Sequence, residues 1–257
     1  MNETPLISII IPTCNYAPFL SDALDSVLAQ NYAPMEIIVV DDGSTDDTPT
    51  VIGRYHAHLG SMLRSIRRDT PSSPAAARNA GLEIASGALV AFLDADDAWT
   101  PNCLQDQIQM FALFPQVGIV MGTLRFWRMF NPSEPTLSPP SVVTQLGTML
   151  IKREVLEQIG GFDTDFRTSE DIDWFLRARE AGVLVALGAH MVLQHRQHNH
   201  NLSRDRSAGS RRSFALALQK STERRRQPDG TISPLPELFY MDPILKAAGQ
   251  YLTVGRV

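Results

Sequence analysis

The chain has 257 residues, 44% of them hydrophobic and 20% charged, and its formal net charge is −5. This composition is typical of a globular α/β protein, and the acidic balance argues against nucleic acid as a partner. No apolar run reaches the roughly 20 residues of a membrane span, and the first residues lack the features of a signal peptide. Cys14 and Cys103 fit neither a disulfide framework nor a zinc site. We therefore expect a reduced, cytoplasmic protein.

The first hundred residues predict strands and helices in alternation. Short β-branched runs indicate buried strands, and apolar residues three or four positions apart indicate helices packed on one face. In chain order the expected elements are a strand at 7–11, a helix at 19–30, a strand at 35–40, a helix at 45–53, a strand at 62–66, a helix at 74–85 and a strand at 88–93. This order favours a mainly parallel, Rossmann-like sheet with right-handed crossovers. The loops after the first, second and fourth strands would then lie along one edge.

Beyond residue 101 the pattern is less regular. We expect helices at 103–114, 152–159 and 171–181, and strands at 117–124 and 183–187. The four prolines of 131–141 predict an irregular surface segment. Residues 200–227 carry eight Lys or Arg against two acidic residues, a local charge of about +6. A solvated helix face explains such a stretch. The alternative is a surface that binds anionic lipid heads or a phosphate-bearing acceptor. The protein would then lie peripherally at the inner face of a membrane.

Carboxylates follow two of the predicted strands. Asp94 and Asp96 come directly after the fourth strand and can converge on one hard cation, Mg²⁺ or Mn²⁺, that shares its shell with a substrate diphosphate. Asp41, at the end of the second strand, can accept hydrogen bonds from a nucleobase or a ribose. Ordinary acidic turns and helix caps are the alternative in both places. The phosphate-binding loops of dinucleotide-binding and P-loop proteins are absent from the sequence.

Five motifs resemble those of the family 2 glycosyltransferases, in order and in spacing. They are Ile9–Tyr16, Val40–Thr48, Ala77–Leu82, Phe92–Asp97, and Gly161–Asp163 leading to Glu170–Asp173. The resemblance covers residues 5 to about 203 and implies a GT-A fold. It further implies inverting transfer from a nucleotide diphospho-sugar, usually a UDP-sugar, to a glycan or lipid-linked acceptor, with Mg²⁺ or Mn²⁺. Residues 1–100 would then form a nucleotide-binding half, 101–203 an acceptor-binding half, and 204–257 a basic helical extension.

The resemblance assigns roles at the sheet edge. The residues implied in nucleotide binding are Pro12, Thr13, Asn15, Tyr16, Asp41, Arg78, Asp94 and Ala95. By the same resemblance Asp96 binds the metal, with Asp94 on the ribose or the metal. Asp97 is either a further ligand or the cap of the following segment.

An inverting transfer needs a general base on the acceptor side. The resemblance gives this role to Asp171, with Glu170 and Asp173 as substitutes; the alternative is that all three carboxylates only favour a helix N-terminus. Trp174 is expected either in the acceptor wall or in the core. The residues expected to line the sugar or acceptor pocket are Gly147, Thr148 and Glu170.

A polar run near residue 200 completes the resemblance. Some family members carry an R-x-H-x-x-N-x-S run, which is matched here by Arg196, His198, Asn201 and Ser203. His198 would reach the metal or the diphosphate from a flexible loop that closes over the donor. His195 and His200 are expected to be ordinary polar residues.

Two other classes of protein are alternatives. A nucleotidyltransferase would need a glycine-rich, basic phosphate loop after the first strand, and residues 12–15 do not form one. A non-catalytic nucleotide-sugar-binding relative would have no reason to keep Asp94, Asp96 and Asp171 together.

Overall fold

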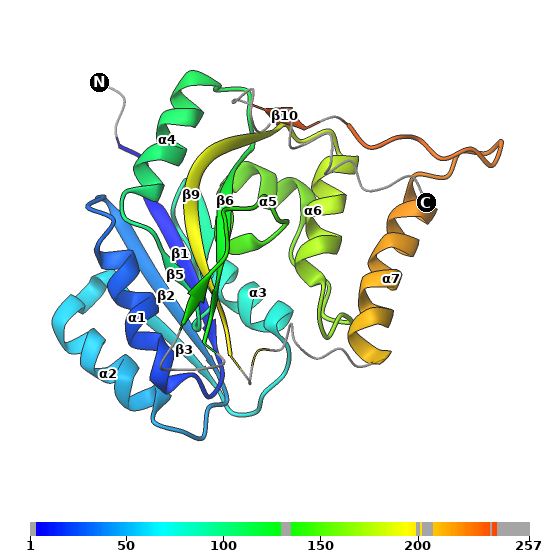
Figure 1. The fold of residues 1–257 in the computed structure, drawn as a ribbon. Helices are drawn as coiled ribbons and strands as arrows, with labels where there is room; N and C mark the ends of the chain where they lie inside the picture. The colour runs from blue at the N-terminus through cyan, green and yellow to red at the C-terminus, as the bar shows by residue number, and fades with distance from the viewer. Residues whose placement is uncertain (1–3, 130–134, 199–200, 202–207, 237, 241–257) are drawn as a thin grey trace.

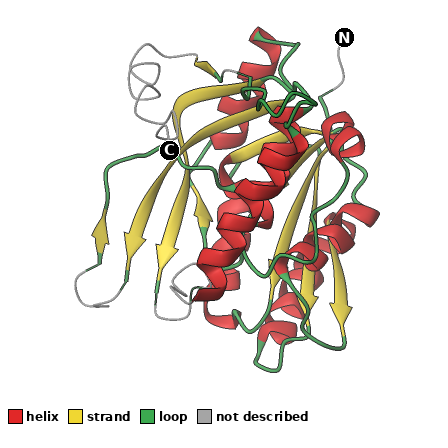
Figure 2. Ribbon diagram, turned by 90° about the vertical axis from the view of Figure 1, so that its right-hand side faces the viewer, coloured by secondary structure: helices red, strands yellow, loops and turns green. Residues whose placement is uncertain are grey.

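A single mixed sheet runs through the part of the protein that the computed structural model describes, residues 4–129, 135–198, 201, 208–236 and 238–240. Its strand order is β10-β9-β6-β8-β4-β1-β2-β3, with β5 paired to β9 and β7 to β6. Helices pack against the strands, as Figures 1 and 2 show. Buried side chains of α1, α2 and α4 form one apolar cluster, and those of α3, α5 and α6 form a second one on the other face.

The first half alternates strands and helices as the sequence predicts. The elements are β1 (Ile7–Thr13), α1 (Ala17–Leu28), β2 (Met35–Asp42), α2 (Thr48–Leu59), a 3-10 turn (Gly60–Met62), β3 (Leu63–Arg68), α3 (Pro74–Ile84) and β4 (Leu89–Phe92). All four strands are parallel, and Thr13 lies beside Asp41. The expectation that the loops after β1, β2 and β4 share one edge is therefore confirmed.

The second half extends the sheet with two long strands, β6 and β9, and with several short ones. Its elements are β5 (Ala98–Trp99), α4 (Cys103–Leu113), β6 (Ile119–Arg128), β7 (Thr136–Leu137), a 3-10 turn (Leu146–Thr148), β8 (Met149–Lys152), α5 (Arg153–Ile159), α6 (Glu170–Glu180), β9 (Val185–Gln197), α7 (Ala208–Arg224) and β10 (Phe239–Tyr240). β8 is antiparallel to both β4 and β6, whereas β6 and β9 are parallel with shifts in register. No described helix is long and apolar enough to cross a membrane.

Several elements differ from the expected ones, and three of the differences have a clear physical reason. α2 begins at Thr48 rather than at 45, because the backbone N–H groups of Thr45 and Asp46 bind the side chain of Asn15 in a turn. The strand expected at 183–187 continues to Gln197, since β6 pairs with it along its polar second half. β8 was not predicted at all, because its four residues lead directly into α5.

Candidate active site

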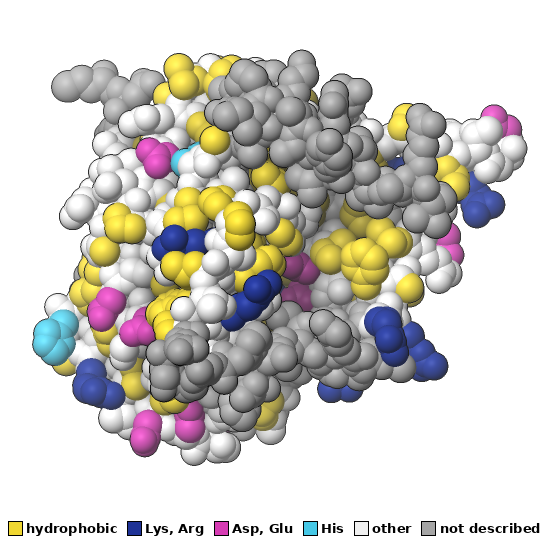
Figure 3. All heavy atoms as spheres, viewed as in Figure 1, with side chains coloured by type: hydrophobic (Ala, Val, Ile, Leu, Met, Phe, Trp, Pro, Cys, Tyr) yellow, Lys and Arg dark blue, Asp and Glu magenta, His cyan; other side chains and the backbone are white. Residues whose placement is uncertain are grey.

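A cavity of about 890 Å³ opens at the edge of the sheet where β1, β2 and β4 end. Six of the expected nucleotide-binding residues line it, namely Pro12, Thr13, Tyr16, Arg78, Asp94 and Ala95. Its opposite wall includes residues of β6, of β9 and of the first turn of α6. In Figure 3, acidic side chains lie recessed beside α6, with apolar side chains on both sides. The cavity thus brings together side chains from both halves of the sequence.

Two expected nucleotide contacts are engaged elsewhere. Asn15, with φ +59°, accepts hydrogen bonds at Oδ1 from the backbone N–H groups of Thr45 (2.8 Å) and Asp46 (3.2 Å). Asp41 is 1% exposed and pairs with Arg67 at 2.7 Å. Neither residue lines the cavity. Both side chains instead shape the loops behind its wall.

Asp42 lines the cavity where Asp41 was expected. Asp41 is instead drawn to Arg67 of β3 and accepts a hydrogen bond from the backbone N–H of Ser44. The sequence motif contains both residues and does not say which one. On the neighbouring strand, Thr13 also lines the cavity, and its buried Oγ1 has no hydrogen-bond partner among the described residues. Buried hydroxyl groups of proteins are normally hydrogen-bonded, which marks Thr13 as a contact for a polar ligand.

Arg78 of α3 is the central cation of the cavity. Its side chain is 6% exposed and forms ion pairs with Asp94, at 2.7 Å, and with Glu170. Burial alone would lower the pKa of Arg78, but the carboxylates of Asp94 and Glu170 raise it. Gln145 donates a hydrogen bond to the second oxygen of Asp94 at 3.2 Å. Asp94 is therefore held in a fixed orientation at the base of the cavity.

Asp96 lies beside His198 and Asn201. Its Oδ2 is 3.1 Å from Nε2 of His198 and accepts a hydrogen bond from Nδ2 of Asn201 at 2.9 Å. His198 also stacks on Phe19, with ring centroids 4.5 Å apart. All the described partners of Asp96 thus come from the end of β9 and the residues that follow it. The distant motifs of the sequence meet here, as the resemblance implies.

Asp97 forms a second carboxylate–histidine pair behind the first. Its side chain is fully buried, with Oδ2 2.9 Å from Nδ1 of His195 and Oδ1 accepting from the backbone N–H of Arg196. Burial raises the pKa of Asp97 to about 6. Burial alone would lower the pKa of His195, but the Asp97 carboxylate outweighs it and raises the pKa to about 9. His195, expected to be an ordinary polar residue, lines the cavity.

The polar run that holds His198 begins as a strand, and His198 itself follows the strand's end. His195, Arg196 and Gln197 belong to β9. The Arg196 guanidinium lies between the rings of Phe19 (4.9 Å) and Trp127 (4.6 Å) and also pairs with Asp22 at 2.7 Å. These contacts anchor the segment to α1 and β6. His200 and Ser203 lie outside the described residues.

The first turn of α6 carries three carboxylates in different surroundings. Glu170 pairs with Arg78, and Asp173 pairs with Arg177 at 2.9 Å. Asp171 lines the cavity and forms no ion pair among the described residues; its Oδ1 accepts only from the backbone N–H of Ile172, at 2.8 Å. Burial and the neighbouring Glu170 charge raise the pKa of Asp171 to about 7, although Arg78 opposes them. This carboxyl is therefore able to take up a proton near neutral pH.

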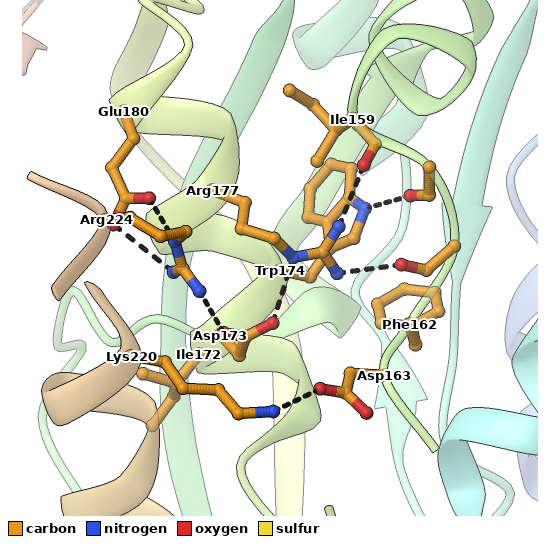
Figure 4. A network of polar contacts seen from close by, with 12 residues as sticks. Ile159, Phe162, Asp163, Ile172, Asp173, Trp174, Arg177, Glu180, Lys220 and Arg224 are labelled. Atoms are coloured by element: carbon orange, nitrogen blue, oxygen red, sulfur yellow. Dashed lines mark hydrogen bonds and ion pairs between the residues drawn. The ribbon is translucent and has the colours of Figure 1, made fainter. Parts of the chain in front are cut away.

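Three residues expected on the acceptor side do not face the cavity. Trp174 is fully buried against Phe162, and its indole N–H donates to the carbonyl of Gly160 at 2.9 Å, so its place is the core (Figure 4). Gly147 and Thr148 are also buried, in a 3-10 turn beneath the cavity wall. The residues of this segment that line the cavity are Val143, Thr144 and Gln145, just before the turn. The sequence therefore pointed to the segment around Gly147 and Thr148, but not to the residues of it that line the cavity.

The donor set at Asp96 fits a divalent cation that completes its shell with a substrate. No group of three or more His, Cys, Asp or Glu side chains is arranged to hold a metal ion anywhere in the described parts of the chain. One carboxylate with an adjacent imidazole nevertheless provides two ligands. Magnesium sites commonly use one or two carboxylates together with waters and substrate phosphates. A resident all-protein metal centre is therefore not what these side chains form.

Solved structures share this fold. TarS of S. aureus, determined with UDP-GlcNAc, superposes with a TM-score of 0.71 at 20% identity, over 84% of this chain and 65% of that one. The mannosyltransferase PcManGT of Pyrobaculum calidifontis, determined with GDP-Man and Mn²⁺, superposes with a TM-score of 0.67 at 23% identity, over 98% and 71%. The curled, mostly parallel sheet flanked by helices is thus a GT-A fold, as expected.

Sequence comparison agrees with the fold. A PGL/p-HBAD biosynthesis glycosyltransferase of Mycobacterium bovis is 42% identical over 196 residues, which are 74% of this chain and 75% of that protein. Two other curated relatives, an uncharacterized glycosyltransferase of Nostoc and TuaG of Bacillus subtilis, are matched over 54% and 42% of their length. The model of the family described as "Glycosyl transferase family 2" matches residues 8–167. The chain belongs to glycosyl transferase family 2.

Proposed function

We propose that this protein is an inverting glycosyltransferase, with a nucleotide diphospho-sugar as donor and a hydroxyl group of a glycan or lipid-linked molecule as acceptor. The observation that carries the proposal is the contrast within the first turn of α6. Glu170 and Asp173 are ion-paired, whereas Asp171 has no such partner among the described residues and lines the cavity that Asp94 and Asp96 also line. A free carboxylate across a cavity from a cation-binding carboxylate is what an in-line displacement requires.

The donor is proposed to lie along the ends of β1 and β2. Thr13, Tyr16 and Asp42 line that part of the cavity. Asp94, which also lines it, would contact the ribose or the metal. Asp96 and His198 would hold Mg²⁺ or Mn²⁺, which offsets the charge that develops on the leaving diphosphate. The bound nucleotides of the two structural neighbours, one with uridine and one with guanosine, support the donor class and leave the base to be measured.

Asp171 is proposed as the general base. It accepts the proton of the acceptor hydroxyl while the oxygen forms a bond to the anomeric carbon and the bond from that carbon to the diphosphate breaks. The raised pKa of Asp171 suits this step, because a stronger base accepts the proton more readily. The apolar side chains beside the recessed acids in Figure 3 offer a surface for the sugar face or the lipid of an acceptor.

Calorimetric titration tests the donor site. The protein is titrated with UDP, GDP and dTDP, each with Mn²⁺ and again with EDTA. We expect one diphosphate to bind in a metal-dependent manner. Transfer is then followed as release of that diphosphate from the matching sugar donors, with a panel of octyl glycosides as acceptors. Binding of none of the three nucleotides would contradict the proposed donor site.

A further inference from the structure

The helix that carries Asp171 begins without a side-chain cap. Ser169, at its N-cap, has φ +68° and its side chain makes no capping hydrogen bond. An N-cap side chain normally stabilises the first turn of a helix. The first turn of α6 must therefore be held in place by other contacts, and Asp171 depends on them for its position.

One contact comes from the nucleotide side, where Glu170 pairs with the buried Arg78. It fixes the residue directly before Asp171. A second contact lies two residues after Asp171, at Asp173, whose side chain is only 2% exposed. Asp171 therefore lies between two anchored carboxylates.

The second anchor reaches α6 from the C-terminal helix (Figure 4). Asp173 Oδ2 accepts from Nε of Arg177 on its own helix, and Oδ1 accepts from Nη1 of Arg224, on α7, at 3.1 Å. Arg224 also binds Glu180, in the last turn of α6, through Nε (2.5 Å) and Nη2 (3.3 Å). One guanidinium thus joins the first and the last turn of the helix.

One face of α7 is docked on the protein, while most of the other described positions are exposed. Ala217 and Ser221 are buried, and Lys220 pairs with Asp163 at 2.7 Å. Two of the cations that make the C-terminal stretch basic, Lys220 and Arg224, are thus paired with acidic side chains of the same chain. A solvated face or a membrane surface is not needed to explain them.

We propose that Arg224 is a positioning residue for Asp171, so that the helix after the family motifs takes part in forming the active site. This inference rests on the proposed function, because it assumes that Asp171 is the base. Arg224 acts through Asp173, because its ion pair with Asp173 keeps the first turn of α6 in a fixed position beside the cavity. Misplacement of a reacting group by about 1 Å can cost about 100-fold in rate.

The test compares three variants of the full chain. Arg224→Gln removes the bridge, Arg224→Lys keeps its charge, and Lys220→Gln removes the neighbouring α7 ion pair, which does not reach α6. Hydrogen–deuterium exchange is measured on peptides that cover 170–177, together with nucleotide affinity and the kcat and KM of diphosphate release. For Arg224→Gln we expect faster exchange in 170–177, unchanged nucleotide affinity and about a tenfold lower kcat. Arg224→Lys should recover most of the kcat, and Lys220→Gln should leave it unchanged.

Two results would overturn the inference. Unchanged exchange in 170–177 in Arg224→Gln would show that the bridge does not hold the first turn. An equal fall in kcat for Lys220→Gln would show that docking of α7 in general matters, and not Arg224. Failure of the proposed function would look different, because Asp171→Asn would then transfer sugar at the normal rate. The exchange measurement would still show whether the Arg224 bridge holds the first turn of α6.

Discussion

Arg78 and Glu170 form a buried ion pair although 92 positions separate them in the sequence. Their side chains are 6% and 7% exposed. The same guanidinium binds Asp94, after β4, so one residue of α3 links the acidic loop at the nucleotide side to the helix that carries Asp171. A change at Arg78 should therefore affect both sides of the cavity at once.

Arg78→Met should strongly destabilise the protein, because it leaves the Glu170 carboxylate buried without its partner. Breaking a buried ion pair typically costs about 3–5 kcal/mol. The free energy of unfolding in urea measures this loss. Arg64→Met is the matched control: Arg64 also pairs with a carboxylate but is 43% exposed, and exposed pairs contribute about 0–1 kcal/mol. Equal losses for the two variants would contradict the assigned importance of burial.

Asp171→Asn should abolish proton uptake while keeping the shape of the site. A general base commonly contributes about 100- to 10,000-fold, so kcat should fall within that range. Nucleotide affinity, measured by calorimetry, should stay the same. Asp165→Asn, at an exposed position before the same helix, serves as control. Transfer by Asp171→Asn at the wild-type rate would exclude this residue as the base.

The rate should depend on pH through Asp171. A base works only when deprotonated, and the pKa of Asp171 is raised to about 7. Below pH 7 the rate should therefore fall about tenfold per unit, and above it the rate should level off. Glu170→Gln removes a charge that raises the pKa of Asp171, so the acidic limb should move to lower pH. If the acidic limb of the pH profile stayed in place in Glu170→Gln, the Glu170 charge would not influence the pKa of Asp171.

His198→Ala should weaken metal-dependent nucleotide binding. His198 is within 3.1 Å of Asp96 and would share the cation with it. We expect at least about tenfold weaker binding of the selected diphosphate with Mn²⁺, in line with losses measured around metal sites. With EDTA the variant and the wild type should bind equally weakly. His58→Ala, on the exposed end of α2, should behave like the wild type.

Gly81→Ala should destabilise the contact between α3 and β1. A Cβ atom at Gly81 would lie 2.5 Å from Cγ2 of Ile10, so the helix must shift. Overpacking of this kind typically costs about 1–3 kcal/mol. At Gly53, in α2, a Cβ atom meets nothing within 4 Å, and Gly53→Ala should stabilise by up to about 1 kcal/mol. Thermal unfolding of the two variants should shift in opposite directions.

The strands of the first half could be predicted because each is a short apolar run that ends in a polar loop. Thr13, Asp94 and Asp96 followed from the same logic, since parallel strands bring their carboxyl ends to one edge. The choice between Asp41 and Asp42 could not be predicted. It depends on which of the two carboxylates pairs with Arg67 of β3, and the sequence marks both residues alike.

The second half was harder to predict for a different reason. β9 contains His195 and Arg196, whose burial depends on a carboxylate and two aromatic rings from distant parts of the chain. No local pattern contains that information. The bridge from Arg224 to Asp173 is likewise set by the packing of two helices, and in the sequence Arg224 reads only as one more charge in a basic stretch.

The stacking of Trp127 on Arg196 gives the protein an optical reporter. The other two tryptophans, Trp99 and Trp174, are almost entirely buried in the core. Trp127 is only partly buried, and the guanidinium on its ring belongs to the residue between the two histidines that face Asp97 and Asp96. Any rearrangement of β9 on cation binding would alter the electrostatic field of the Arg196 guanidinium at the Trp127 indole. The intrinsic fluorescence of the unlabelled protein should therefore report such a change through Trp127.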